Sequence, residues 1–501
     1  MKIVFINPVI DKSKDQLIWA SALTHNLFGR MTVMPKLAPM VLAARTPPQH
    51  TVEYIDEDIE DIDVNGIKAD LIAITAMTVQ IVRAYQLADA FRKRGIKVAL
   101  GGIHASSCPD EAAQHADAVC VGEADNSWPE LIKDLENGCL KPRYDVKDYP
   151  PVTELVSPRV DIIKHKFYSM FPVQATKGCP HDCDFCCINF SSGHKYRMKP
   201  VEQVVAEIRA FEKYNKEPFR KRYHFVDDNL YVNREYTIKL FTAIKELKIK
   251  WMGMGSLNIA GDDEVLRVMA ESGCKSFSIG YESISDESLA EANKSRANKV
   301  SEYQTAADKL IKHGIIPAGY FIFGFDSDDE EVFARTVAFT RKYHILTPYF
   351  NILTPFPGTR LYDRVKERIF DKTWSHYGSL KCVFKPAKLQ PEQIEAGSYW
   401  ASRQAALLDD MKRQLMYFWS QGPWETNPPL RAGERFLLRA IGFKVRRNKQ
   451  YRDFLVWASK QKNAVDLFQI VMTVTFDDMA KKFVLEQPDG SVQAPVPVMG
   501  K

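Results

Sequence analysis

Three cysteines that follow a short apolar segment constrain this chain more than any other feature of its sequence. Cys179, Cys183 and Cys186 have the spacing C-x3-C-x2-C, and residues 173–176 just before them are strand-like in composition. Thiolates at this spacing can bind three corners of a cubane iron–sulfur cluster and leave one iron open for a substrate. A structural zinc site needs a fourth ligand at a comparable distance. We therefore expect an iron–sulfur loop, with zinc as the weaker alternative.

This motif resembles that of the radical S-adenosylmethionine (SAM) superfamily, in which an aromatic residue such as Phe185 precedes the third cysteine. The resemblance implies that Cys179, Cys183 and Cys186 bind a [4Fe–4S] cluster. It also implies that the open iron binds SAM, with Phe185 near the adenine, and that the reduced cluster cleaves SAM to a 5′-deoxyadenosyl radical. Cys187 departs from the minimal pattern. This fourth thiol either competes for the cluster or is a small buried hydrophobe, as free cysteine often is.

Length and charge limit the classes of protein to consider. A chain of 501 residues fits two or three domains. Its 68 basic and 63 acidic residues give a net charge of +5, which does not indicate a nucleic-acid partner. The apolar run after Met1 is too short for a signal peptide, and no run of about 18 apolar residues predicts a membrane span. Cysteines without disulfide spacing indicate a reducing compartment, so we expect an oxygen-sensitive cytoplasmic protein.

The first 140 residues alternate strand-like and helix-like segments. Strands are expected at 2–7, 51–56, 70–77, 97–102 and 118–122, with amphipathic segments such as 81–94 between them. This alternation predicts an α/β domain of Rossmann-like, or flavodoxin-like, form over residues 1–140. Ligands of such sheets bind at the carboxyl ends of the strands.

Small residues follow three of these expected strands. The loops resemble those of the cobalamin-binding domain in cobalamin-dependent radical SAM enzymes, and the resemblance covers most of residues 1–140. A generic flavodoxin-like domain would also carry Gly-Gly after a strand, but the nearby cysteine motif favours cobalamin. The resemblance implies cobalamin contacts at Thr75, Met77, Thr78, Gly101, Gly102, His104, Gly122 and Glu123.

His104 raises the question of how cobalt is coordinated. The Asp-x-His-x-x-Gly signature, through which other cobalamin proteins supply an axial histidine, is absent. Many members of this radical SAM subgroup hold cobalamin without a protein histidine. The missing signature therefore bears on which group coordinates cobalt and does not argue against cobalamin binding. We expect His104 to shape its loop rather than to bind cobalt.

A second α/β region follows residues 141–170, a proline-punctuated segment that we interpret as a linker. Strands are expected at 173–176, 222–226, 250–256, 276–281, 316–323 and 348–353, and the first helix opens at Pro200. Six such repeats fit a partial (β/α)6 barrel over 171–384, as in the radical SAM superfamily, rather than a complete barrel of eight.

Polar residues follow several of these strands, where barrel enzymes place their chemistry. Two adjacent carboxylates, suited to hold an ammonium group, end one strand, and segments like the family's Gly-x-Glu-Ser and Gly-x-Ile-x-Gly patterns lie at two later ones. The resemblance implies SAM contacts at Asp227, Asp228, Ser256, Glu282 and Gly324. The alternative for the polar side chains is ordinary helix capping. No side chain is assigned a catalytic role.

The remaining chain is predicted to be a small helical C-terminal domain, residues 385–501, that closes the active site. It follows a segment at 354–362 that resembles the Thr-Pro-x-Pro-Gly-Thr sequence common after the core of cobalamin-type radical SAM proteins, and it opens with an amphipathic stretch at 391–413. Aromatic and basic residues there fit helix packing, or contact with an apolar substrate or a membrane surface. They surround Trp419, Trp424, Phe436 and Trp457.

Together these features identify the chain as a member of the cobalamin-dependent radical SAM family. The resemblance implies a methyltransferase that acts on an unactivated carbon of a small hydrophobic molecule, with methylcobalamin as methyl donor and a flavodoxin, ferredoxin or reductase as electron donor. Two alternatives stay open. One is an oxidative cyclase or rearrangement enzyme of the tetrapyrrole type on the same scaffold, and the other is a cobalamin or redox sensor, for which the sequence shows no output module.

Overall fold

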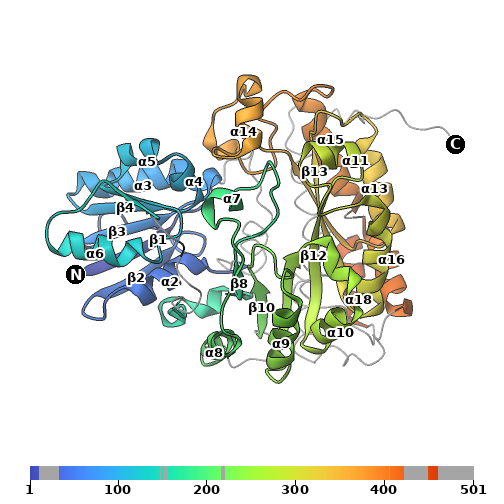
Figure 1. Cartoon of the computed structure of the whole chain (residues 1–501), viewed down its shortest axis with the longest axis horizontal. Helices are drawn as coiled ribbons and strands as arrows, with labels where there is room; N and C mark the ends of the chain where they lie inside the picture. Colours follow the sequence, from blue (N-terminus) through green and yellow to red (C-terminus); the bar gives the residue numbers. More distant parts are fainter. Residues whose placement is uncertain are drawn as a thin grey trace. The chain divides into compact units, whose positions relative to one another are not determined.

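A computed structural model describes residues 1–10, 33–146, 149, 156–215, 221–405, 407–421 and 449–460 (Figure 1). The chain forms two compact units. The first comprises Met1–Val232 and Thr354–Phe384, and the second comprises Asn233–Leu353 and Lys385–Lys501. The sequence predicted four parts, residues 1–140, 141–170, 171–384 and 385–501. This division stays a prediction.

The first unit begins with a six-stranded parallel sheet in the order β2-β1-β3-β4-β5-β6. The order 2-1-3-4-5 is that of flavodoxin-like folds, which confirms the predicted Rossmann-like class. One strand, β6, lies within the segment interpreted as a linker, where it pairs with the edge of β5. The strands are β1 (Lys2–Asn7), β2 (Thr51–Asp56), β3 (Leu71–Thr75), β4 (Lys97–Gly101), β5 (Ala118–Val121) and β6 (Arg143–Asp145).

Helices cover both faces of this sheet. Helices α3 and α5 lie on one face, and α2 lies on the other, where it packs against α6 (Figure 1). Strands β3 and β4 are apolar on both faces because each face is covered, and Ile72, Ile74, Val98 and Leu100 are buried in the core. The helices are α2 (Leu37–Arg45), α3 (Ile81–Lys93), α4 (Ile103–Ser107), α5 (Pro109–His115) and α6 (Ser127–Glu136).

The first unit also contains the start of the second α/β region. Strands β7 (Phe171–Val173) and β10 (Arg222–Phe225) pair in parallel, and β8 (Thr176–Lys177) and β9 (Arg197–Met198) form an antiparallel hairpin. The strand expected at 173–176 is thus divided in two. The reason is that the N–H groups of Ala175 and Thr176 donate to Asp227 instead of a neighbouring strand. The helices of this part are α7 (Ile188–Ser191), α8 (Val201–Glu212) and α14 (Arg360–Val365).

The second unit continues the pattern with four parallel strands, each paired with the next in the chain. Along the chain, β7, β10 and these four strands alternate with helices, in agreement with the predicted partial (β/α)6 barrel. The strands are β11 (Lys250–Gly255), β12 (Cys274–Glu282), β13 (Ile316–Phe323) and β14 (Thr347–Ile352). The helices are α9 (Arg234–Lys245), α10 (Asp263–Glu271), α11 (Asp286–Glu291), α12 (Tyr303–Lys312) and α13 (Val332–Lys342).

Three further helices of the second unit are α15 (Pro391–Ala405), α16 (Leu408–Gln421) and α18 (Lys449–Ser459). The amphipathic stretch predicted at 391–413 is therefore interrupted between α15 and α16. Trp457 packs on Phe454, with ring centroids 5.6 Å apart, whereas Trp424, Phe436 and the side chain of Trp419 lie outside the described residues. Among the helices that the structure describes, none combines the length and apolar composition of a membrane span.

Candidate cofactor sites

The cysteine motif lies on a loop whose two ends are joined by the hairpin β8/β9. Lys177 pairs with Arg197 at the mouth of this loop. Gly178, the next residue, has a φ of +83°, and a Cβ there would collide with the carbonyl oxygen of Lys195. Only glycine allows the two ends to approach so closely, so the position before Cys179 is fixed by sterics.

The three predicted cluster ligands differ in exposure. Cys183 is buried, while Cys179 and Cys186 are half-buried. The N–H of Cys186 donates to the carbonyl of Cys183 at 3.1 Å, which folds the intervening residues, with the half-buried Phe185, into a turn. In the described part of the chain no three His, Cys, Asp or Glu side chains converge on one point. In a cubane cluster each thiolate binds a different iron atom, so the three thiol groups need not converge on one point.

Cys187 occupies a different position from its neighbour. It is the residue immediately before helix α7, and the N–H of Ser191 donates to its carbonyl. Burial raises the pKa of the Cys187 thiol to about 12. The side chain thus belongs to the start of a helix rather than to the turn that carries Cys186.

Asp227 and Asp228 hold the entry to the cluster loop. Oδ1 of Asp227 accepts from the N–H of Ala175 at 3.1 Å and from the hydroxyl of Thr176 at 2.7 Å. Oδ2 of Asp228 accepts from the N–H of Gly178 at 2.7 Å. Burial raises the pKa of Asp227 to about 7, and also raises the pKa of Asp228. Oδ2 of Asp227 has no hydrogen-bond partner among the described residues, so one acceptor of this carboxylate is unused there.

Asn229 extends this set of contacts to the first cysteine. Its side chain is buried, and Nδ2 lies 3.9 Å from Sγ of Cys179, to which it donates. Three consecutive residues after β10 therefore bind three successive parts of the cluster loop. Sequence patterns suggested a ligand site for the two aspartates but gave no sign of the contact between Asn229 and Cys179.

Two arginines of α14 bind the residues between the cysteines. Arg360 Nη1 lies 2.6 Å from Asp182 Oδ2, and Arg364 Nη1 lies 2.5 Å from Asp184 Oδ2. The N–H of Leu361 donates to the carbonyl of Asp184 at 3.0 Å. The segment after the barrel core thus holds the cluster loop from outside, a role that the sequence did not reveal.

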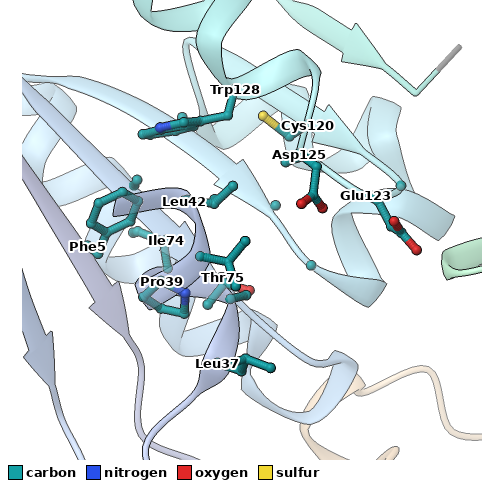
Figure 2. A pocket seen from close by; sticks show the side chains of 18 of the residues that line it. Phe5, Leu37, Pro39, Leu42, Ile74, Thr75, Cys120, Glu123, Asp125 and Trp128 are labelled. Carbon is teal, nitrogen blue, oxygen red and sulfur yellow. The ribbon is translucent and has the colours of Figure 1, made fainter. Parts of the chain in front are cut away.

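A cavity of about 330 Å³ opens at the carboxyl ends of β3, β4 and β5 (Figure 2). One wall is apolar and aromatic, with Phe5, Leu42 and Trp128, and the opposite rim consists of small and acidic residues. Five of the eight predicted cobalamin contacts line it, namely Thr75, Gly101, Gly102, Gly122 and Glu123. Gly102 has a φ of +98°, and a Cβ there would lie 2.6 Å from the carbonyl oxygen of Ala76, so the rim requires glycine at this point.

The other three predicted cobalamin residues do not line the cavity. Met77 is 38% exposed, and Thr78 is buried at the start of the 3-10 turn Thr78–Gln80. His104 is fully buried, with its ring centroid 4.9 Å from that of Trp374 and Nε2 3.5 Å from Oε1 of Glu111. Burial lowers the pKa of His104. The structure therefore places this histidine in a packed aromatic cluster.

The acidic rim of the cavity is joined to the cluster loop by buried ion pairs. Glu123 binds Arg197 through both carboxylate oxygens and lies 3.3 Å from Nζ of Lys177. Asp125, on the same rim, lies 3.1 Å from that ammonium group. The sequence predicted a cofactor contact for Glu123 but not its ion pairs with Arg197 and Lys177.

The predicted SAM residues of the second unit all lie at carboxyl ends of strands. Ser256 follows β11, Glu282 is the last residue of β12, and Gly324 follows β13 with a φ of +106°. Glu282 has a φ of +61°, unusual for a residue other than glycine. Its Oε1 lies 2.6 Å from Nζ of Lys294, and this ion pair, rather than a helix cap, engages its side chain.

One face of the second unit's sheet packs on helices, and the described residues of the other face are only half-buried. Trp251 stacks on Phe241 of α9, and Phe323 packs on Phe333 of α13, with ring centroids 4.6 and 4.8 Å apart. Figure 1 shows α13 and α16 on this side of β12 and β13. The opposite side, which we call the open face, consists of half-buried residues. They are Met252, Met254, Ser278, Gly280, Tyr320, Ile322, Tyr349 and Asn351.

Known proteins resemble both α/β regions. Residues 35–132 match the B12 binding domain, and residues 173–340 match the Radical SAM superfamily. The bacteriochlorophyllide d C-8(2)-methyltransferase of Chlorobaculum tepidum is 35% identical over 368 residues, which are 70% of this chain and 81% of that protein. The C-12(1)-methyltransferase of the same organism is 31% identical over 392 residues, 76% and 85% of the two chains. The chain belongs to the cobalamin-dependent radical SAM methyltransferases.

Solved structures agree with this membership at the level of the fold. The radical SAM methyltransferase TsrM from Kitasatospora setae, with cobalamin and a [4Fe–4S] cluster bound, matches with a TM-score of 0.61 and 13% identity, over 96% of this chain and 99% of that one. Family membership confirms that the chain is an enzyme. It also confirms the three predicted cofactors, which are cobalamin, a [4Fe–4S] cluster and SAM.

The residues of this cobalamin-dependent radical SAM methyltransferase fit the groups that its family binds. Two buried oxygens near the cavity, Oδ1 of Asp125 and Oγ of Ser127, have no hydrogen-bond partner within the described ranges. Small residues on the rim allow backbone to approach a large flat ligand, and the apolar wall suits an aromatic group.

Proposed function

We propose that the enzyme methylates an unactivated carbon of a hydrophobic, planar ring compound of the tetrapyrrole class. The observation that carries the proposal is the open face. Tyr320 and Tyr349 stack there with ring centroids 5.0 Å apart, and Ile322 and Met254 on the same face are apolar. Burial of flat apolar surface on such a face is favourable by about 25 cal/mol per Å², and aromatic side chains add stacking. The two relatives named for a bacteriochlorophyllide support the same class.

The chain's residues would divide the work as follows. Cys179, Cys183 and Cys186 would hold the cluster, and the residues at 227–229 would fix the loop that carries them. When bound, the cluster and SAM supply a hydrogen-abstracting radical, and cobalamin supplies the methyl group. The protein must then exclude water and oxygen while it orients the substrate carbon. A side-chain base is not required for this sequence of events.

An external electron carrier belongs to the same proposal. Each reductive cleavage of SAM consumes one electron, which the cluster must regain from outside the chain before the next cleavage. A flavodoxin, a ferredoxin or their reductase would supply it. Because oxygen destroys exposed iron–sulfur clusters, we place this exchange in the cytoplasm.

Anaerobic reconstitution with iron, sulfide and hydroxocobalamin, followed by reaction with dithionite, SAM and bacteriochlorophyllide d, tests the proposal. The expected result is formation of 5′-deoxyadenosine and S-adenosylhomocysteine together with a pigment heavier by one CH2. A pigment oxidised without a gain of carbon would instead indicate the cyclase alternative. No turnover of the pigment, with methylation of an open-chain or polycyclic lipid, would contradict the tetrapyrrole class.

The contact between Asn229 and Cys179 leads to a separate prediction. An N–H donor to a cluster sulfur stabilises the more negative reduced state and raises the reduction potential. Replacing Asn229 with leucine, which keeps the volume but removes the donor, should lower the midpoint potential of the cluster. Redox titration followed by electron paramagnetic resonance measures this shift.

Asn233→Leu provides the control for this variant. Asn233 caps helix α9 by accepting from the N–H of Tyr236 at 2.9 Å, so its loss should reduce stability by about 1 kcal/mol. The cluster potential should stay unchanged. If Asn229→Leu binds a complete cluster at the wild-type potential, the hydrogen bond to Cys179 has no electronic role.

A further inference from the structure

We propose that Asp125 binds cobalamin directly, by accepting a hydrogen bond from an amide or hydroxyl group of the cofactor. The motif pattern had pointed to its neighbour Glu123 for contact with the cofactor. The proposal rests on the assignment of the cavity to cobalamin and is independent of the substrate. The proposal follows from a difference between the two carboxylates of the rim, Glu123 and Asp125, in how many of their oxygens already have hydrogen-bond partners.

The carboxylate of Glu123 already has its partners inside the protein. Oε2 accepts from Nη1 of Arg197 at 2.9 Å and lies 3.3 Å from Nζ of Lys177, and Oε1 accepts from Nη2 of the same arginine. Glu123 therefore serves the connection to the hairpin and has little capacity left for a ligand.

Asp125 is arranged differently. Its side chain is 5% exposed, and Oδ2 lies 3.1 Å from Nζ of Lys177. Oδ1 has no hydrogen-bond partner among the described residues, and Nη2 of Arg45 lies 3.9 Å from it. Figure 2 shows this carboxylate on the wall of the cavity, opposite Thr75. A buried carboxylate oxygen without a donor is unfavourable, and a donor from a ligand in the cavity would remove that penalty.

The chemistry of the ligand follows from the acceptor. An ionised carboxylate between Lys177 and Arg45 can only accept hydrogen bonds, so its partner must carry N–H or O–H. Cobalamin offers both, as amide groups around the corrin ring and as a hydroxyl on its nucleotide tail. Because Lys177 directly precedes the cluster loop, the same carboxylate would link the bound cofactor to that loop.

Asp125→Asn tests the proposal with little change in shape. The amide oxygen would turn to Lys177, so an NH2 group would face the cavity and meet another donor. We expect cobalamin affinity to fall by about tenfold or more, as for loss of a charged hydrogen bond. Equilibrium dialysis with hydroxocobalamin under anaerobic conditions gives the dissociation constant. Asp145→Asn, the same change in an exposed ion pair with Arg143 on β6, should leave that constant unchanged.

Titration with cobinamide, which lacks the nucleotide tail, separates the two sources of the donor. Equal weakening of cobalamin and cobinamide supports a corrin amide, whereas weakening of cobalamin alone supports the hydroxyl of the tail. Wild-type affinity for both ligands in folded Asp125→Asn would overturn the proposal. If that variant does not fold, Asp125→Glu keeps the charge and displaces the oxygen by one methylene. Its unchanged affinity would be equally decisive against a direct contact.

Discussion

Cys186→Ser should abolish the cluster and reduce 5′-deoxyadenosine formation to background. The physical reason is that the thiolate is the ligand, and a serine hydroxyl at the same place stays protonated and binds iron poorly. With only two cysteines of the motif left, a cubane would lack a third protein ligand. Iron and sulfide content, the visible absorption of the reconstituted protein and product analysis by mass spectrometry measure the effect.

Cys187→Ser is the matched control, because it makes the same change one residue further along. The turn closed by the hydrogen bond from Cys186 to Cys183 holds these two cysteines at the proposed spacing, whereas Cys187 is the residue before helix α7. We expect a complete cluster and normal SAM cleavage in this variant. Loss of the cluster in Cys187→Ser, or its retention in Cys186→Ser, would show that the motif uses a different set of thiols.

The sequence predicted the strands well where their burial is complete. The expected segment 97–102 corresponds to β4, because a strand covered on both faces is a continuous apolar run. Strand β6 carries no such signal. Only Tyr144 of its three residues is buried. The hydrophobic pattern of such a short edge strand with charged neighbours does not differ from that of a loop. The interpretation of this region as a linker followed from that weak pattern.

In the candidate sites, too, the sequence predicted features that lie within one short segment but not contacts between distant segments. The cysteine spacing and the glycines after strands are local, and they predicted the cluster loop and five residues of the cavity rim. The contacts that hold these elements join residues far apart in the chain. Asp182 and Arg360 are 178 positions apart, and Glu123 and Arg197 are 74 apart. Periodicity reports how a segment is buried but not which other segment meets it.

Glu123→Ala should be the most destabilising substitution on the cavity rim. The side chains of Glu123 and Arg197 are 8% and 4% exposed, and removal of the carboxylate leaves the guanidinium buried without its partner. Loss of one member of a buried ion pair typically destabilises a protein by about 3–5 kcal/mol. Urea unfolding followed by circular dichroism should show an earlier first transition. The shift in its midpoint is the quantity to compare, since a chain with two compact units need not unfold in one step.

Two further variants show whether the unpaired Arg197 guanidinium causes the loss of stability. Glu130→Ala removes an exposed partner of Lys141, and it should have only a small effect because solvent screens such pairs. The double variant Glu123→Ala with Arg197→Met should recover part of the stability, since it removes the cation together with its carboxylate. If Glu123→Ala were as mild as Glu130→Ala, the buried pair would not hold the rim to the hairpin. A large loss with partial recovery would instead mean that one carboxylate stabilises both the cavity rim and the base of the cluster loop, so that loading of cobalamin and of iron should decline together.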